Sequence, residues 1–154
     1  MPVQKLRDYL DENKVKYVSI SHSKAYTASA VAASAHVKGK NLAKTVIVKL
    51  DGKITMAVLP AKHRVDLEQL RKVSLSGTVE LATEDDFEKT FSNCEGGAMP
   101  PFGNLYSVPV YVEKSLSDDE EIAFNACSHS ELIQLAYKDF ARLVKPTVAI
   151  FRMQ

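Results

Sequence analysis

The chain has 154 residues, of which 45% are hydrophobic and 25% are charged, and these values predict one soluble globular domain over residues 1–154. A formal net charge of +1 excludes a general attraction to polyanions, so nucleic-acid binding would depend on a local patch. The sequence also lacks the roughly 18 consecutive apolar residues of a membrane span and the apolar core of a signal peptide, so no membrane association is expected.

In the first half of the chain, the spacing of apolar residues predicts helices and strands in alternation. The expected elements are a helix over 3–13, a strand over 16–22, a helix over 28–37 capped by Thr27, strands over 43–50 and 53–60, a helix over 65–73 capped by Asp66, a strand over 77–83 and a short helix over 84–91. Asp51-Gly52 between two β-rich runs is the clearest hairpin signal.

In the second half, a strand is expected over 105–114, where Pro109 implies an edge or a bulge. Strands over 120–128 and 130–136, a helix over 137–144 and a last strand over 147–153 follow, with the acidic run 118–121 as a solvated turn. Residues 130–144 also fit one longer helix, and periodicity does not separate the two. The pattern predicts an α+β fold with a central mixed, mainly antiparallel β-sheet surrounded by helices.

Lys44 begins the first strand of the predicted hairpin. Alternation places it on the same face as Val46, Val48 and Leu50, while Ala43, Thr45, Ile47 and Lys49 face the other way. A lysine on the more apolar face is unexpected, because lysine is rarely buried without a partner. Either Lys44 extends its ammonium to solvent from the strand start, or it lies in a cleft and faces an anionic or carbonyl group.

The segment from Asn93 to Leu105 reads NCEGGAMPPFGNL and can be neither regular helix nor central strand. Its paired glycines, which include Gly97, free backbone N–H groups to approach a ligand, and the paired prolines, which include Pro101, stiffen the far side. Such a loop can hold a developing oxyanion without an ionisable residue. A rigid surface turn is the alternative that composition favours.

Two further places carry polar residues suited to a ligand. His22, Tyr26 and Thr27 lie where a predicted strand gives way to a helix, and a helix N-terminus suits a phosphate or a carboxylate. Thr27 as a simple N-cap is the alternative. His129 lies between two predicted strands, where it could hydrogen-bond a substrate hydroxyl or act only as a turn or packing residue.

The remaining candidates are weaker. Cys94 and Cys127 are outside any CxxC motif, which suits a reducing cytoplasm. Cys94 is either a small apolar filler or, in a rival mechanism, the nucleophile of a thiol-dependent hydrolase. The histidines show no ligand spacing for zinc, and no metal or other cofactor is expected. The basic run over 62–72, KHRVDLEQLRK, fits phosphate contact and a solvated helix face equally well.

Four segments taken together are more specific than any single residue. The segments HSKAYTASAVA, GKNLAKTVIVKLDGKITMAVLPAKHRVDLEQL, GGAMPPFG, and ACSHSELIQL with DFARLV resemble the YbaK-type aminoacyl-tRNA editing domain, which occurs as free-standing deacylases and as the insertion domain of bacterial prolyl-tRNA synthetases. The resemblance spans nearly the whole chain. Its most specific parts are Lys44, in the AKT sequence, and the GxxxP element from Gly97 to Pro101.

The resemblance implies hydrolysis of the ester that joins a wrong amino acid to the 3′ end of tRNA. Lys44 would position the terminal adenosine and its phosphate, the backbone at Gly97 would engage the aminoacyl group, and the substrate's own hydroxyl would assist the attacking water. Pro101 would shape the loop, and Thr27 and His129 would contact the ligand. The bulky Met99 departs from the family pattern and would narrow the pocket. The identity of the amino acid that is removed therefore cannot be taken from any subfamily.

The expected partners are the acceptor end of an aminoacyl-tRNA and, loosely, an aminoacyl-tRNA synthetase, in the cytoplasm. Synthetases for small amino acids need a second, hydrolytic site, because one methylene gives only about 1–3 kcal/mol of discrimination. A second function stays open: a non-catalytic module that keeps the pocket and binds tRNA or a synthetase without cleaving anything.

Overall fold

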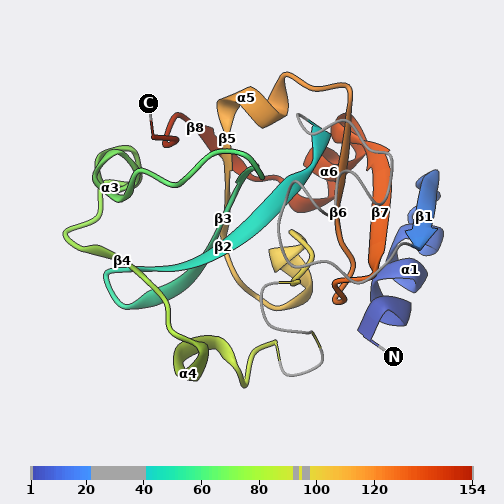
Figure 1. Cartoon of the computed structure of the whole chain (residues 1–154), viewed down its shortest axis with the longest axis horizontal. Coiled ribbons are helices and arrows are strands. Elements are labelled where there is room, and N and C mark those ends of the chain that lie inside the picture. Colours follow the sequence, from blue (N-terminus) through green and yellow to red (C-terminus); the bar gives the residue numbers. More distant parts are fainter. Residues whose placement is uncertain (1, 22–40, 92–93, 95–97, 154) are drawn as a thin grey trace.

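The computed structural model describes residues 2–21, 41–91, 94 and 98–153 (Figure 1). In chain order the elements are α1 (Pro2–Glu12), β1 (Tyr17–Ser21), β2 (Ala43–Leu50), β3 (Lys53–Pro60), α3 (Leu67–Ser74), β4 (Val79–Leu81), α4 (Glu84–Phe87), the 3-10 helix η2 (Gly103–Leu105), β5 (Val110–Glu113), α5 (Lys114–Ser117), β6 (Glu121–Asn125), β7 (Glu131–Ala136), α6 (Tyr137–Val144) and β8 (Thr147–Ala149). The helix expected over 28–37 lies outside the described residues.

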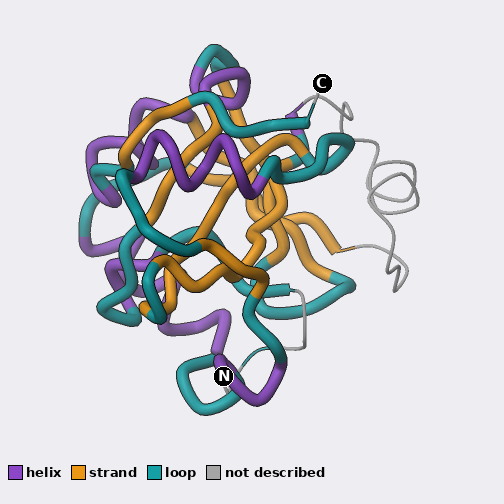
Figure 2. The backbone as a smooth tube through the Cα atoms, turned by 90° about the vertical axis from the view of Figure 1, so that its left-hand side faces the viewer, coloured by secondary structure: helices purple, strands orange, loops and turns teal. Residues whose placement is uncertain are grey.

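The strands form two sheets flanked by helices, which confirms the predicted α+β class. The sequence did not indicate that the strands would be divided between two sheets. One sheet is antiparallel with the order β1-β7-β6, and the other is mixed with the order β4-β2-β3-β5-β8. A parallel bridge between Leu42 and Ala123 joins the start of β2 to β6. The strands run through the middle of the molecule and most of the helices lie outside them (Figure 2).

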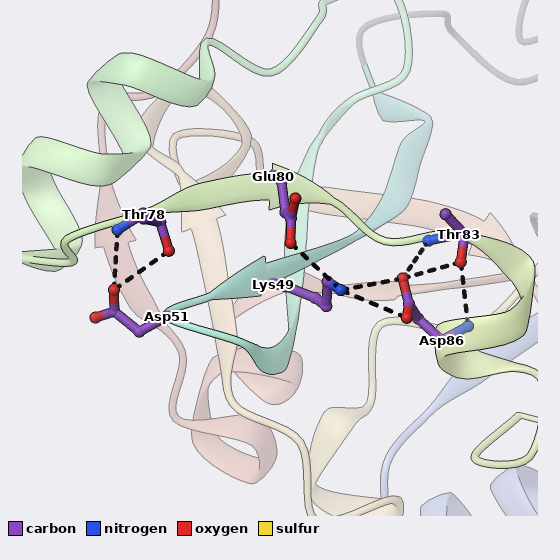
Figure 3. A network of polar contacts seen from close by, with 6 residues as sticks. All are labelled: Lys49, Asp51, Thr78, Glu80, Thr83 and Asp86. Atoms are coloured by element: carbon purple, nitrogen blue, oxygen red, sulfur yellow. Dashed lines mark hydrogen bonds and ion pairs between the residues drawn. The ribbon is translucent and has the colours of Figure 1, made fainter.

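The β2–β3 hairpin forms as predicted. Its register runs from Ala43 opposite Pro60 at the open end to Leu50 opposite Lys53 at the turn. Asp51 and Gly52 both adopt positive φ, 52° and 84°, as a two-residue hairpin turn of this kind requires. The Asp51 carboxylate also accepts the N–H groups of residues 77 and 78, and Lys49 contacts Glu80 and Asp86, so β4 and α4 are tied to the hairpin (Figure 3).

Both faces of β2 are packed, although the sequence suggested one face more apolar than the other. Val48 belongs to a buried cluster that includes Leu70 of α3 and Phe151 near the C-terminus. Ile47, on the opposite face, belongs to the main core between the two sheets. The end of β2 that carries Lys44 is therefore held between two packed layers.

Two predictions about the second half are settled by the structure. Pro109 precedes β5, which lies inside the sheet between β3 and β8, so the predicted edge or bulge is wrong. The carbonyl of Pro109 instead accepts the N–H of Met56. Residues 131–136 form β7, followed by α6, which excludes one long helix over 130–144. The short helix α5 was not predicted.

The cap predicted at Asp66 forms, and α4 begins with a capping box that was not predicted. The carboxylate of Asp66 accepts the N–H of Gln69 at the start of α3, 3.0 Å away. At α4 the Thr83 hydroxyl and the Asp86 carboxylate form a capping box, each accepting a backbone N–H from the other residue. These local contacts fix where α3 and α4 begin.

Candidate functional site

Lys44 lies at the open end of the hairpin, opposite Leu59, and its side chain is half-buried. Burial lowers the pKa of its ammonium, and the nearby Arg64 guanidinium lowers that pKa further. No ion pair joins Lys44 to a carboxylate within the described part of the chain. A partly desolvated cation without an acidic partner is suited to an anionic ligand.

His63 and Arg152 form a polar pair beside Lys44. Nη1 of Arg152 lies 3.1 Å from Nε2 of His63. Because a guanidinium can only donate, Nε2 accepts and the neutral ring carries its proton on Nδ1. The pKa of His63 is lowered by burial first, then by the positive charges of Arg152 and Lys62. Glu113 acts in the opposite direction, and Lys44 adds the smallest lowering effect. His63 therefore favours its neutral form among cations.

The proline-rich part of the predicted loop is not a surface turn. Residues 98–103 are all buried, and both Met99 and Phe102 belong to the main core. The Phe102 ring packs against the rings of Phe124 and Phe140, with centroids 5.5 and 5.4 Å away. Gly103 is required by close packing, because a Cβ there would clash with the carbonyl oxygen of Val108. Pro101 thus lies in a segment anchored deep in the fold.

His129 lies in the turn between β6 and β7 and is only 9% exposed. This turn is tied to the proline-rich segment, because the N–H of Cys127 donates to the carbonyl of Ala98 over 2.8 Å. The hydroxyls of Ser128 and Ser130, on either side of His129, lie 2.9 Å apart. The structure therefore brings the 98–103 segment and the 126–130 turn together.

Cys94 and Cys127 form a disulfide. This bond does not support the expectation that the two cysteines are suited to a reducing cytoplasm. Neither cysteine is a free thiol. The rival mechanism with Cys94 as nucleophile is wrong for this state of the protein, because a disulfide sulfur carries no thiolate. The bond provides a covalent link between the glycine-proline loop and the turn that holds His129.

The structure sorts the predicted site residues into groups. Lys44 lies with Arg64 and His63, and Met99 and Pro101 lie in the segment next to the 126–130 turn. No polar contact joins Lys44 to the 98–103 segment among the residues described. The remaining predicted site residues, His22, Tyr26, Thr27 and Gly97, lie outside the described residues.

Asn125 is a polar residue that the sequence analysis did not single out. Leu42 bridges Ala123 in parallel, and two residues further along each segment come Lys44 and Asn125. The Oδ1 atom of Asn125 is buried without a hydrogen-bond partner. Its position directly after the three apolar residues of β6, IAF, was the only signal in the sequence. An unpaired amide oxygen at this level of β6 is available to a ligand donor.

A cavity of about 810 Å³ lies elsewhere, where β1 begins and β7 ends, and it contains none of the predicted site residues. Within the described ranges, no three or more His, Cys, Asp or Glu side chains are grouped to hold a metal ion. None of the helices described has the length and apolar character needed to cross a membrane.

Comparison with known proteins agrees with this geometry. Residues 22–143 match the aminoacyl-tRNA editing domain family. The prolyl-tRNA editing protein ProX of Acetoanaerobium sticklandii is 26% identical over 149 residues, which cover 93% of this chain and 90% of that protein. The multifunctional Ser/Thr-tRNA deacylase ProXp-y of Escherichia coli is 26% identical over 161 residues, which cover 97% of this chain and 92% of that protein.

Solved structures show the same fold. The crystal structure of a candidate trans-editing enzyme for prolyl-tRNA synthetase superposes with a TM-score of 0.84 at 17% identity, over 99% of this chain and 98% of that one. Another, of a hypothetical protein, gives a TM-score of 0.85 at 16% identity over 97% and 99% of the two chains. The family match covers well over half of the sequence and confirms the predicted resemblance. The chain belongs to the aminoacyl-tRNA editing domain family.

Proposed function

We propose that the protein is a free-standing hydrolase that removes a small, wrongly attached amino acid from tRNA. The observation that carries the proposal is Lys44, a half-buried ammonium with no carboxylate partner among the described residues. Family membership supports the reaction class, and the relatives are named as a prolyl-tRNA editing protein and a Ser/Thr-tRNA deacylase. The cytoplasm, where translation takes place, is the expected compartment.

In this proposal Lys44 binds the phosphate of the terminal adenosine and fixes the ester beside the loop. Backbone N–H groups at Gly97 face the carbonyl oxygen, and Pro101 holds the loop in shape. A water molecule, assisted by the neighbouring ribose hydroxyl, adds its oxygen to the carbonyl carbon. The ester C–O bond then breaks, and the departing ribose oxygen takes a proton. The products are the free amino acid and a deacylated tRNA.

An activated ester needs less catalytic help than an amide, so one cation and backbone donors are sufficient without a serine or cysteine nucleophile. A charge pair 4 Å apart is worth about 4 kcal/mol at an effective dielectric constant near 20. If the Lys44 contact is made in the transition state, its loss would slow the reaction on the order of several hundredfold. The candidate substrates are tRNAs for proline or another amino acid that carry alanine, serine, cysteine or threonine.

The direct test is a panel of mischarged tRNAs, assayed for release of the amino acid by the purified protein. Release of one or more small amino acids is expected from the wild type, and a loss of several hundredfold in kcat/KM is expected from Lys44→Ala. Lys53→Ala is the matched control, because Lys53 lies at the other end of the same hairpin. Equal rates for Lys44→Ala and the wild type would remove Lys44 from the mechanism.

Tight binding of charged tRNA without turnover across the whole panel would instead support a non-catalytic binding module. Any association with a synthetase is tested separately, by measuring whether the synthetase changes the deacylation rate at fixed tRNA concentration. The proposal requires no such association, because this chain and the ribose hydroxyl of the tRNA supply all the hydrolytic groups.

A further inference from the structure

Basic side chains from three segments meet at the open end of the β2–β3 hairpin. We name this group the basic end; it consists of Lys44, Lys62, His63, Arg64 and Arg152. Lys44 is the second residue of β2, the next three follow β3, and Arg152 lies near the C-terminus. Only the first part of the basic run over 62–72 belongs to this group, since Arg71 lies on α3 and pairs with Glu68.

Backbone contacts hold these segments together. The N–H of Ala61 donates to the carbonyl of Leu42 over 2.8 Å, which fixes the segment after β3 against the start of β2. An antiparallel bridge joins Val65 to Arg152, and the N–H of Met153 donates to the carbonyl of Arg64 over 2.8 Å. The cations are therefore presented by a fixed framework.

No ion pair neutralises the cations of the basic end among the described residues. Elsewhere in the structure, cations such as Lys49 and Arg142 pair with carboxylates 3.3–3.5 Å away. Lys62, Arg64 and Arg152 have no such pair among the described residues. The nearby acid Glu113 is 2% exposed, and its carboxylate accepts the backbone N–H and the hydroxyl of Ser115.

The mutual effect of these charges shows that they lie close together. Arg64 lowers the pKa of Lys44, and Lys62, Lys44 and Arg152 all lower the pKa of His63. Grouping like charges without ion-paired acids costs free energy in the unliganded protein. That cost is removed when a ligand with several negative charges binds. Because the net charge of the whole chain is only +1, this local group is what can attract such a ligand.

We propose that the basic end binds consecutive phosphates of the tRNA acceptor end, next to the terminal nucleotide held by Lys44. This inference rests on the proposed function, because it extends from Lys44 along the same strand of RNA. Arg64 and Arg152 supply planar guanidinium groups suited to phosphate oxygens, and Lys62 supplies a point charge. The neutral His63 accepts from Arg152 and orients its guanidinium. Such contacts fix position without reading sequence.

The test is equilibrium binding of an uncharged acceptor-stem minihelix ending in CCA, measured over a range of salt concentrations. Lys62→Gln/Arg64→Gln removes two charges from the basic end. Lys53→Gln/Lys72→Gln removes two exposed lysines that lie at the hairpin turn and on α3. The two double variants have the same net charge, and thermal unfolding of each checks that it is folded.

The expected result is a rise of about tenfold or more in Kd for Lys62→Gln/Arg64→Gln, with the slope of log K against log salt reduced by about 1–2, and little change for the control pair. Equal Kd values and slopes for the two pairs would overturn the inference. Equally tight binding of polyglutamate would also overturn it, because the basic end would then be a general site for polyanions.

Uncharged RNA separates this test from the test of the proposed function. A weakened Lys62→Gln/Arg64→Gln variant supports the basic end even if no mischarged tRNA is hydrolysed. Deacylation by the wild type with unchanged minihelix binding in that variant supports the enzyme and overturns the basic end.

Discussion

Lys44 is half-buried beside Arg64, and the pKa of its ammonium is lowered by burial first and by the Arg64 guanidinium second. Because the two positive charges repel each other, the pH dependence of the proposed reaction depends on Arg64, a residue outside the hairpin. It also means that the charged form of Lys44 is less stable here than in the unfolded chain.

The first prediction concerns activity against pH. If the reaction requires the ammonium, kcat/KM falls as the pH rises through the lowered pKa of Lys44, below its ordinary value of 10.5. Arg64→Gln removes a positive neighbour, so the pKa of Lys44 rises and the fall moves to higher pH. The measurement is the deacylation rate across pH with the uncatalysed ester hydrolysis subtracted. A fall at the same pH in both proteins would show that Lys44 does not control it.

The second prediction concerns stability. A folded-state pKa below the unfolded value means that the unfolded chain binds more protons between the two values, so stability rises with pH through that window. Lys44 therefore costs stability below its folded pKa. Lys44→Met should raise the free energy of unfolding near neutral pH, and its advantage should shrink as the pH approaches 10.5. Urea unfolding at several pH values measures this, and a variant less stable than wild type at neutral pH would contradict it.

The third prediction concerns the disulfide between Cys94 and Cys127, which are 33 residues apart. Closing a loop of that length in the unfolded chain is worth about 3–4 kcal/mol in the chain-entropy account. Reduction of the disulfide should lower the free energy of unfolding by about 3–4 kcal/mol. The Cys94→Ser/Cys127→Ser variant should have the same free energy of unfolding as the reduced wild type, and adding reductant should not change it. Thiol titration of the unfolded, unreduced protein gives the check, because two reactive thiols would mean that the bond is absent. Cys94→Ser is expected to keep deacylation activity.

Much of the fold was predictable because its signals are local. Asp51-Gly52 between two β-rich runs fixed the hairpin, and Asp66 fixed the start of α3. The division into two sheets was not predictable, because it depends on pairings between distant residues. Met56 pairs with Val110 in parallel, and such a pairing leaves no periodic trace in either strand. The prediction of an edge or a bulge at Pro109 was wrong for the same reason, because the start of β5 depends on its pairing with β3, which is far away in sequence.

The candidate site divides in the same way. Lys44 was found because a charge interrupts an apolar alternation, which is visible in eight residues of sequence. Arg64, which lies near Lys44, and Arg152, which contacts His63, were not predicted to meet. A backbone bridge between Val65 and Arg152 brings together segments from the middle and the end of the chain. Asn125 was missed because its unpaired oxygen is defined only by what surrounds it in the fold.

The last prediction concerns Met99, which the sequence analysis expected to narrow the amino-acid pocket. Met99 is 4% exposed and belongs to the main core, so Met99→Ala should destabilise the protein by about 2–5 kcal/mol whatever its role. Met56→Ala, in the same core on β3, carries a comparable cost and is the control. If Met99 borders the pocket, its removal should also raise the rate for threonine relative to alanine by about 10- to 200-fold. Both variants are assayed on the two mischarged tRNAs at a temperature where each is folded. If Met99→Ala and Met56→Ala both keep the wild-type ratio of the threonine rate to the alanine rate, Met99 serves only the core.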